Sequence, residues 1–143
     1  MATREGSAHW TGSLFEGKGT VRTGSGILDD ARLTFASRFE DGEGTNPEEL
    51  IGAAHAGCFS MAFSKLLADA GHPPASIHTR ALVSLEKTGE GFSITKIHLH
   101  TRCDVPGIDE EEFQRQAEAA KRGCPVSRAL AGPEITLQAE LVG

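Results

Sequence analysis

The sequence predicts an α+β fold, because segments with strand periodicity and segments with helix periodicity are grouped separately along the chain. Three observations carry this prediction: short glycine-separated strands in the first 36 residues, one long apolar helix from Pro47 to Ala70, and a hairpin pattern between residues 77 and 103. The 143 residues are enough for one hydrophobic core. We therefore expect a single domain over residues 1–143, with antiparallel sheet.

Composition and charge exclude several classes of protein. Hydrophobic residues make up 38% and charged residues 24%, which is typical of a globular chain and not of a disordered, collagen-like or coiled-coil one. The net charge of −6 argues against a general nucleic-acid or anionic-membrane binder. The first residues lack the apolar segment of a signal peptide, and the longest uncharged apolar run, Leu50 to Ser64, is shorter than the about 18 residues that span a bilayer. We expect a soluble, cytoplasmic protein with no nucleic-acid or membrane partner.

The long helix has a clear start and a clear end. Asn46 can cap it, Pro47 suits the first helical position, and Glu48 and Glu49 complement the positive end of the helix dipole. Its apolar residues cover nearly the whole circumference, which predicts burial on most sides. About 24 residues at 1.5 Å each make a rod of roughly 36 Å, more than one small subunit can wrap. We therefore expect a homodimer.

The remaining elements are predicted from alternation, turns and caps. In the second hairpin strand the apolar residues change from even positions (Phe92, Ile94) to odd ones (Ile97, Leu99), which predicts a bulge near Thr95. Asp109 is the expected cap of the second helix. The predicted strands are Ala8–Phe15, Gly19–Thr23, Arg32–Ala36, Ile77–Glu86, Phe92–Cys103 and Ile135–Leu141, and the further helices run from Asp109 to Arg122 and from Pro125 to Ala131.

Three cysteines without a C-x-x-C spacing favour neither a secreted disulfide framework nor structural zinc. Each thiol could simply be a small buried apolar group. Cys58 lies in the middle of the apolar helix, where burial raises the pKa of a thiol and makes it inert unless a cation reaches it. His55, one turn earlier, would suggest a Cys–His hydrolase. The other candidate is Arg38, in the predicted loop before the helix.

Cys124 is predicted at the N-cap of a short helix, where backbone N–H groups favour a thiolate, although it could also be a mere junction residue. Two thiols in contrasting settings suit a peroxidatic and a resolving cysteine. Glu48 lies about 80° around the helix from Cys58 and about 15 Å along it, so the two side chains cannot touch on one straight helix. Glu48 would therefore orient Arg38, or reach the site across a dimer interface. Glu49 points nearly opposite and fits a capping box with Asn46.

Histidines on the second hairpin strand raise the question of a metal. His98 and His100 alternate onto one face and could bind a metal with His78. No carboxylate or thiol is placed to complete such a site, so a solvated strand face is favoured and no metal is expected.

Several motifs together resemble the osmotically inducible protein C (OsmC) family of peroxidases. The resemblance spans practically the whole chain and favours the OsmC branch over the related organic hydroperoxide resistance branch. The motifs that carry it are A-H-W-T-G with G-K-G-T-V near the start, the run R-F-E-D-G-E-G-T-N-P-E-E-L-I-G-A-A-H-A-G-C-F-S-M-A-F at Arg38–Phe63, I-T-K-I-H-L-H at Ile94–His100, V-P-G-I-D at Val105–Asp109 and G-C-P-V-S at Gly123–Ser127.

The resemblance implies a thiol peroxidase for organic hydroperoxides in oxidative and osmotic stress defence. Its OsmC-like fold would have antiparallel sheets wrapped around a long buried central helix, in an intertwined homodimer with active sites at the interface. Cys58 would be peroxidatic and Cys124 resolving, while Arg38 would stabilise the thiolate and Glu48 would orient Arg38. No cofactor would be bound, and the reductant would be the dihydrolipoyl group of a lipoylated protein. Cys103 matches no family motif and is expected to be a spare, structural thiol.

An arginine suits the expected mechanism because its charge does not titrate and its planar fork can hold thiolate and peroxide together. Phe59, Met61 and Phe63 are candidate apolar walls of a pocket that favours alkyl peroxides. Two other functions stay open at this point. A non-catalytic redox-sensing or binding protein could use the same scaffold, and a Cys–His hydrolase based on His55 is a more distant alternative.

Overall fold

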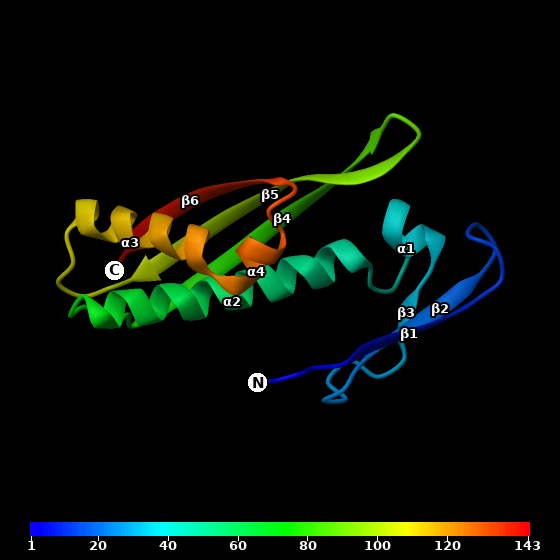
Figure 1. Cartoon of the computed structure of the whole chain (residues 1–143), viewed down its shortest axis with the longest axis horizontal. Helices are drawn as coiled ribbons and strands as arrows, with labels where there is room; N and C mark the ends of the chain where they lie inside the picture. Colours follow the sequence, from blue (N-terminus) through cyan, green and yellow to red (C-terminus); the bar gives the residue numbers. More distant parts are fainter. The chain divides into compact units, whose positions relative to one another are not determined.

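A computed structural model describes all residues from 1 to 143, in two compact units, Met1–Leu50 and Ile51–Gly143. The prediction of one domain over the whole chain stays a prediction. Helices and strands are labelled in Figure 1, and helix α2 begins in the first unit and continues in the second. The elements are β1 (Gly6–Thr11), β2 (Lys18–Thr23), β3 (Ala31–Leu33), α1 (Phe35–Phe39), α2 (Pro47–Asp69), β4 (Ser76–Thr88), β5 (Gly91–Asp104), α3 (Glu110–Gly123), α4 (Pro125–Ala129) and β6 (Glu134–Val142).

The first unit contains an antiparallel sheet in the order β1-β2-β3. The predicted strand Arg32–Ala36 is wrong, because the strand ends at Leu33 and helix α1 follows. Thr34 and Ser37 form a capping box: the Thr34 hydroxyl accepts from the Ser37 N–H, and the Ser37 hydroxyl accepts from the Thr34 N–H. Arg38 therefore lies on a short helix and not in a loop.

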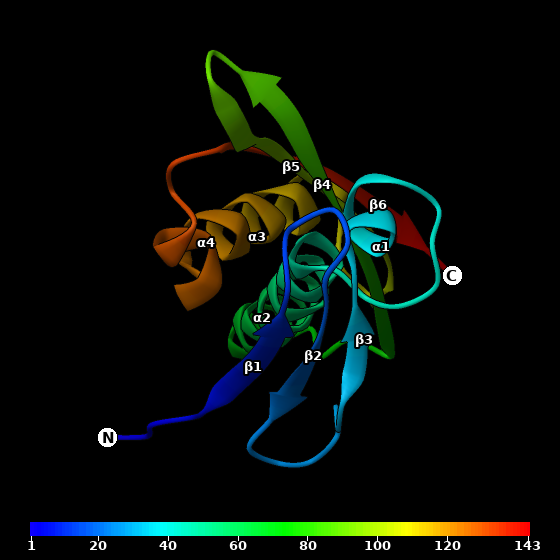
Figure 2. The ribbon, with the colours of Figure 1, turned by 90° about the vertical axis from the view of Figure 1, so that its right-hand side faces the viewer.

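The second unit contains the sheet β4-β5-β6, with β5 in the centre. Strands β4 and β5 are antiparallel as predicted, but β6 runs parallel to β5, so the prediction of a purely antiparallel sheet is wrong. The chain crosses over through α3 and α4 between these two strands, and a crossover returns the next strand in the same direction. Figure 2 shows α2 and α3 on the same face of this sheet.

The predicted bulge near Thr95 is confirmed. Ser84 pairs with Lys96 and Leu85 with Ile94, so Thr95 has no partner on β4. The turn of the hairpin is shorter than predicted, since β4 continues to Thr88 and β5 begins at Gly91. Gly89 in this turn has a φ of 58°, a conformation that favours glycine.

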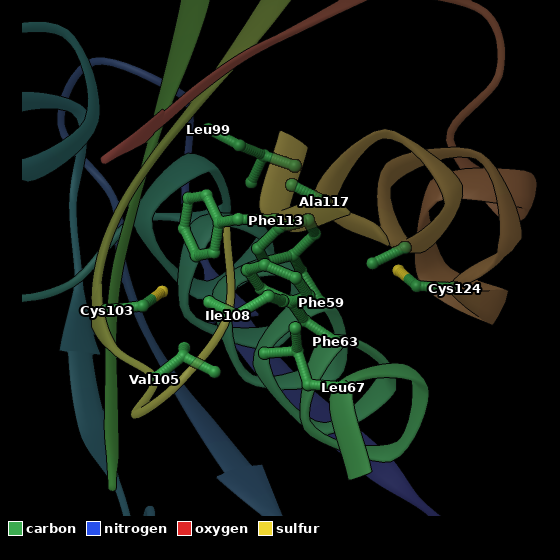
Figure 3. Packing of buried hydrophobic residues seen from close by; sticks show 11 residues of the cluster. Phe59, Phe63, Leu67, Leu99, Cys103, Val105, Ile108, Phe113, Ala117 and Cys124 are labelled. Atoms are coloured by element: carbon green, nitrogen blue, oxygen red, sulfur yellow. The ribbon is translucent and has the colours of Figure 1, made fainter. Parts of the chain in front are cut away.

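The core of the second unit lies between α2, α3 and the central strand (Figure 3). Phe59, Phe63 and Leu67 are four residues apart, so they form one fully buried stripe along α2. The Phe63 ring lies 5.5 Å from that of Phe59 and 5.4 Å from that of Phe113 on α3, measured between centroids. These contacts hold the middle of α2 against α3.

Replacing Phe63 by alanine is expected to lower the free energy of unfolding by about 3–5 kcal/mol, because it removes a fully buried ring and leaves a cavity. Urea denaturation followed by circular dichroism measures this loss. Lys65→Ala on the exposed side of the same helix is the control, with an expected change within about 0.5 kcal/mol. Equal effects of the two substitutions would contradict this account of the core.

The opposite side of α2 is exposed in the single chain. Ala53, Ala54 and Gly57 are exposed, and 77% of the surface of Met61 is accessible. One chain thus buries only one side of α2, and the expected burial on most sides is not reached within it. By length and composition alone α2 could also cross a membrane, but core helices of soluble proteins meet the same criterion and its phenylalanines belong to the core.

Candidate functional site

The four predicted site residues form two pairs. Arg38 and Glu48 belong to the first unit, Met1–Leu50, whereas Cys58 and Cys124 belong to the second. The structure brings the members of each pair into contact. Their catalytic roles stay predictions.

Arg38 and Glu48 form an ion pair between α1 and the first turn of α2. The Arg38 Nε donates to Glu48 Oε1 at 2.9 Å, and the Glu48 carboxylate is buried. Only Nε takes part in this hydrogen bond, which leaves the two terminal nitrogens of the guanidinium for another partner. The structure thus contains the contact through which Glu48 would orient Arg38.

The start of α2 is only partly as predicted. Asn46 caps the helix, since its Oδ1 accepts from the Glu49 N–H at 2.8 Å. The predicted reciprocal half of the capping box is wrong, because the Glu49 carboxylate accepts from the Thr45 hydroxyl at 2.7 Å instead. Glu49 is thereby held at the helix start and is separate from the Arg38–Glu48 pair.

Arg38 lies at an apolar pocket that the sequence analysis missed. None of the predicted walls lines this pocket: Phe59 and Phe63 are fully buried in the core, and Met61 is on the surface. The signal that could have revealed the pocket is the spacing of Phe35 and Phe39, one helical turn apart on α1, with ring centroids 4.9 Å apart. The pocket has a volume of about 350 Å³ and is lined by Trp10, Leu14, Leu33, Thr34, Phe35, Arg38, Phe39 and Pro47.

Cys58 and Cys124 lie next to each other with both thiols reduced. Cys58 is half-buried on α2, and Cys124 is fully buried at the N-cap of α4, as predicted. The Ser127 N–H donates to the Cys124 sulfur at 3.3 Å, which fixes this sulfur at the helix start. The two thiols are close enough for Cys124 to influence the pKa of Cys58.

The pKa of the Cys58 thiol is raised, chiefly by burial. A backbone hydrogen bond with Val126 of α4 lowers it in part. The neighbouring Cys124 thiol raises it again. None of the groups within Ile51–Gly143 that shift this pKa is cationic, so the thiol in this setting stays protonated at neutral pH until a cation reaches it.

His55 is fully buried and does not form the Cys–His pair that a hydrolase requires. Its Nε2 is 2.7 Å from the Ser127 hydroxyl, and its Nδ1 has no hydrogen-bond partner. Burial lowers the pKa of His55, which keeps the ring neutral at pH 7. The structure therefore gives His55 a partner 72 positions away in the sequence, which local spacing could not indicate.

Cys103 and the strand histidines lie apart from the thiol pair. Cys103 is buried beside the Thr101 hydroxyl, and Figure 3 shows it at the far end of the core cluster from Cys124. The strand histidines are only partly buried: His98 bonds to Thr136 at 2.6 Å, and His100 bonds to Glu140, both on β6. The His100 contact lowers the pKa of the Glu140 carboxyl. No group of three His, Cys, Asp or Glu side chains is placed to hold a metal ion.

Comparisons with known proteins identify the family. The family model described as "OsmC-like protein" matches residues 40–140. The chain is 54% identical over 138 residues to the peroxiredoxin OsmC of Escherichia coli K12, covering 96% of both chains. It is 35% identical to an organic hydroperoxide resistance protein of Xanthomonas axonopodis, over 67% of each chain.

A solved structure agrees with the sequence matches. The organic hydroperoxide resistance protein OsmC of Legionella pneumophila is 27% identical, has a TM-score of 0.76 and covers 98% of both chains. The match to a peroxiredoxin extends over nearly the full length of both chains. This chain belongs to the OsmC family and is a cysteine-based peroxidase.

Proposed function

We propose that the protein reduces organic hydroperoxides to alcohols through Cys58 and Cys124. The Cys58 thiolate attacks the distal peroxide oxygen, the alcohol leaves, and Cys58 becomes a sulfenic acid. The Cys124 sulfur then attacks the Cys58 sulfur, releasing water and forming a disulfide that an external dithiol reduces. The contact between the Cys58 and Cys124 thiols is the observation that carries this proposal, because condensation needs the two sulfurs side by side.

The pocket at Arg38 supports an alkyl hydroperoxide as the substrate. Its aromatic and aliphatic lining favours an apolar substituent, and the Arg38 guanidinium supplies a charged group for the peroxide oxygens. Relatives named organic hydroperoxide resistance proteins agree with this substrate class.

We also propose a homodimer with the active sites at the interface. Cys58 needs a cation, and the exposed small residues of α2, Ala53, Ala54 and Gly57, allow a second helix to approach closely. Sedimentation equilibrium is expected to give about twice the chain mass of 15.1 kDa. A monomer at micromolar concentration would contradict the proposal.

The electrons are proposed to come from outside the chain. A dihydrolipoyl group of a lipoylated protein would supply the dithiol in the cytoplasm, with no cofactor bound to the chain itself. The net charge of −6 gives no electrostatic reason for nucleic acid or an anionic membrane as a partner.

The first experiment measures consumption of tert-butyl hydroperoxide and of hydrogen peroxide by the purified protein, with dihydrolipoamide as reductant. Sustained turnover that is faster with the alkyl peroxide is expected. A single oxidation per chain without turnover would instead support the redox-sensing alternative. Ester hydrolysis that depends on His55 and needs no reductant would support the hydrolase.

Replacing Arg38 by alanine is expected to raise the pKa of Cys58 and to slow peroxide attack by about 10²-fold at pH 7, since a charged group that stabilises the thiolate is removed. A group with a raised pKa ionises at higher pH, so the rate profile shifts toward alkaline pH. Stopped-flow kinetics between pH 5 and 10 measures this shift. Arg32→Ala removes an exposed arginine that also has an acidic partner, and serves as the control. An unchanged profile for Arg38→Ala would remove Arg38 from the site.

A further inference from the structure

A buried chain of three polar side chains leads away from Cys124. The Cys124 thiol donates to the Ser127 hydroxyl at 3.3 Å, and the Ser127 hydroxyl is 2.7 Å from His55 Nε2. All three residues are at least 96% buried, so water does not compete for these hydrogen bonds. The chain runs from α4 to α2, where His55 precedes Cys58 by one turn.

The donors available allow the hydrogen bonds to run from Cys124 through Ser127 to His55. Since the thiol gives its hydrogen to Ser127, the Ser127 hydroxyl can give its own hydrogen to Nε2 of a neutral His55. Burial lowers the pKa of His55, so the ring is neutral and Nε2 can accept at neutral pH. The ring hydrogen then lies on Nδ1, the nitrogen without a partner.

Resolution of the sulfenic acid requires a proton to leave Cys124, because the thiolate and not the thiol is the nucleophile. The mechanism proposed above uses Arg38 for the first step, but assigns no residue to the removal of this proton. Ser127 is the side chain in contact with the Cys124 sulfur that can take its proton.

We propose that Ser127 is a catalytic residue of the resolving step and that His55 is the positioning residue behind it. As Cys124 attacks the Cys58 sulfenic acid, its proton passes to Ser127 and the Ser127 proton passes to His55 Nε2. The S–S bond forms as the S–O bond of the sulfenic acid breaks, and the departing hydroxide takes up the proton that His55 returns through Ser127, so that it leaves as water. Cys58 is reduced from the sulfenic state as Cys124 is oxidised, and His55 ends neutral again. This inference rests on the function proposed above.

The test separates the two half-reactions in a single turnover of the full protein. Cys58 oxidation by tert-butyl hydroperoxide is followed first, and decay of the sulfenic acid, trapped by dimedone at set times, gives the rate of disulfide formation. Ser127→Ala and His55→Gln are each expected to leave the first rate unchanged and to slow the second by about 10²-fold. The double variant is expected to be no slower than either single one, since the two residues act as a unit.

Three controls distinguish proton transfer from loss of structure. Thr101→Val removes a buried hydroxyl that lies 3.3 Å from the Cys103 sulfur, and is expected to leave both rates unchanged. Ser127→Thr keeps the hydroxyl and is expected to retain the wild-type rate of disulfide formation. Raising the pH ionises thiols without a base, so it is expected to restore disulfide formation in Ser127→Ala.

Disulfide formation at the wild-type rate in Ser127→Ala would overturn the inference. So would a loss that neither Ser127→Thr nor alkaline pH restores. If Ser127→Ala fails to fold, the inference is tested by His55→Gln and Ser127→Thr, through the rates of Cys58 oxidation and of disulfide formation. Failure of the wild type to form a Cys58–Cys124 disulfide would instead overturn the proposed function, and so is a different outcome.

Discussion

Cys58→Ser is expected to abolish peroxide reduction, leaving only the rate measured without protein. A serine hydroxyl stays protonated at neutral pH and cannot form a sulfenic acid, so neither the first step nor the disulfide is possible. The substitution changes one atom on a half-buried helix position, and the fold is expected to persist. Loss of tert-butyl hydroperoxide, followed with dihydrolipoamide present, measures the effect.

Cys103→Ala is the matched control for Cys58→Ser. It also removes one thiol from the same chain, but this thiol is buried beside Thr101 and apart from the thiol pair. Burial raises the pKa of Cys103, which makes it a poor nucleophile. We expect full turnover and a loss of stability of about 1 kcal/mol from the small cavity. Turnover by Cys58→Ser, or its loss in Cys103→Ala, would assign the peroxidatic role to another thiol.

Cys124→Ser is expected to leave one oxidation per chain and to block further turnover with a dithiol. Cys58 can still attack the peroxide, but its sulfenic acid has no neighbouring sulfur with which to condense. Mass spectrometry after one equivalent of peroxide is expected to show one added oxygen on Cys58, where the wild type shows a loss of two hydrogens. Serine keeps a group that can accept from the Ser127 N–H, so the start of α4 is expected to persist.

The outcome for Cys124→Ser also bears on the alternatives. Unchanged turnover would refute the resolving role and would require the dithiol to attack the sulfenic acid directly. A wild type that stops after one oxidation would favour the sensor. Neither result would change the family, which depends on the sequence matches.

Features that depend on adjacent residues could be predicted well. Asn46 and Asp109 cap their helices, and Cys124 caps α4, because a cap is formed by a side chain and an N–H two or three positions later. The bulge at Thr95 was visible as a change of apolar phase within one strand. The capping box of Thr34 and Ser37 was equally local, but the strand-like pattern of the preceding residues concealed it.

The parallel pairing of β6 could not be predicted in the same way. Alternating residues show that Glu134–Val142 is a half-buried strand, but they do not show which strand it joins or in which direction. That choice depends on the crossover through α3 and α4, and therefore on how α3 packs on the sheet. The contacts of His98 and His100 with β6 follow from the same pairing.

By itself the sequence determined the α+β class, the long helix with its cap, the family motifs and the two cysteines, because each is contained in a short run of residues. Only the tertiary structure decided that Phe35 and Phe39, not Phe59 and Phe63, line a pocket with Arg38. The hydrogen bond between His55 and Ser127, which are 72 positions apart in the sequence, was likewise visible only in the tertiary structure. Such contacts depend on which surfaces are buried together when distant segments pack, and that is a property of the whole fold and not of any segment.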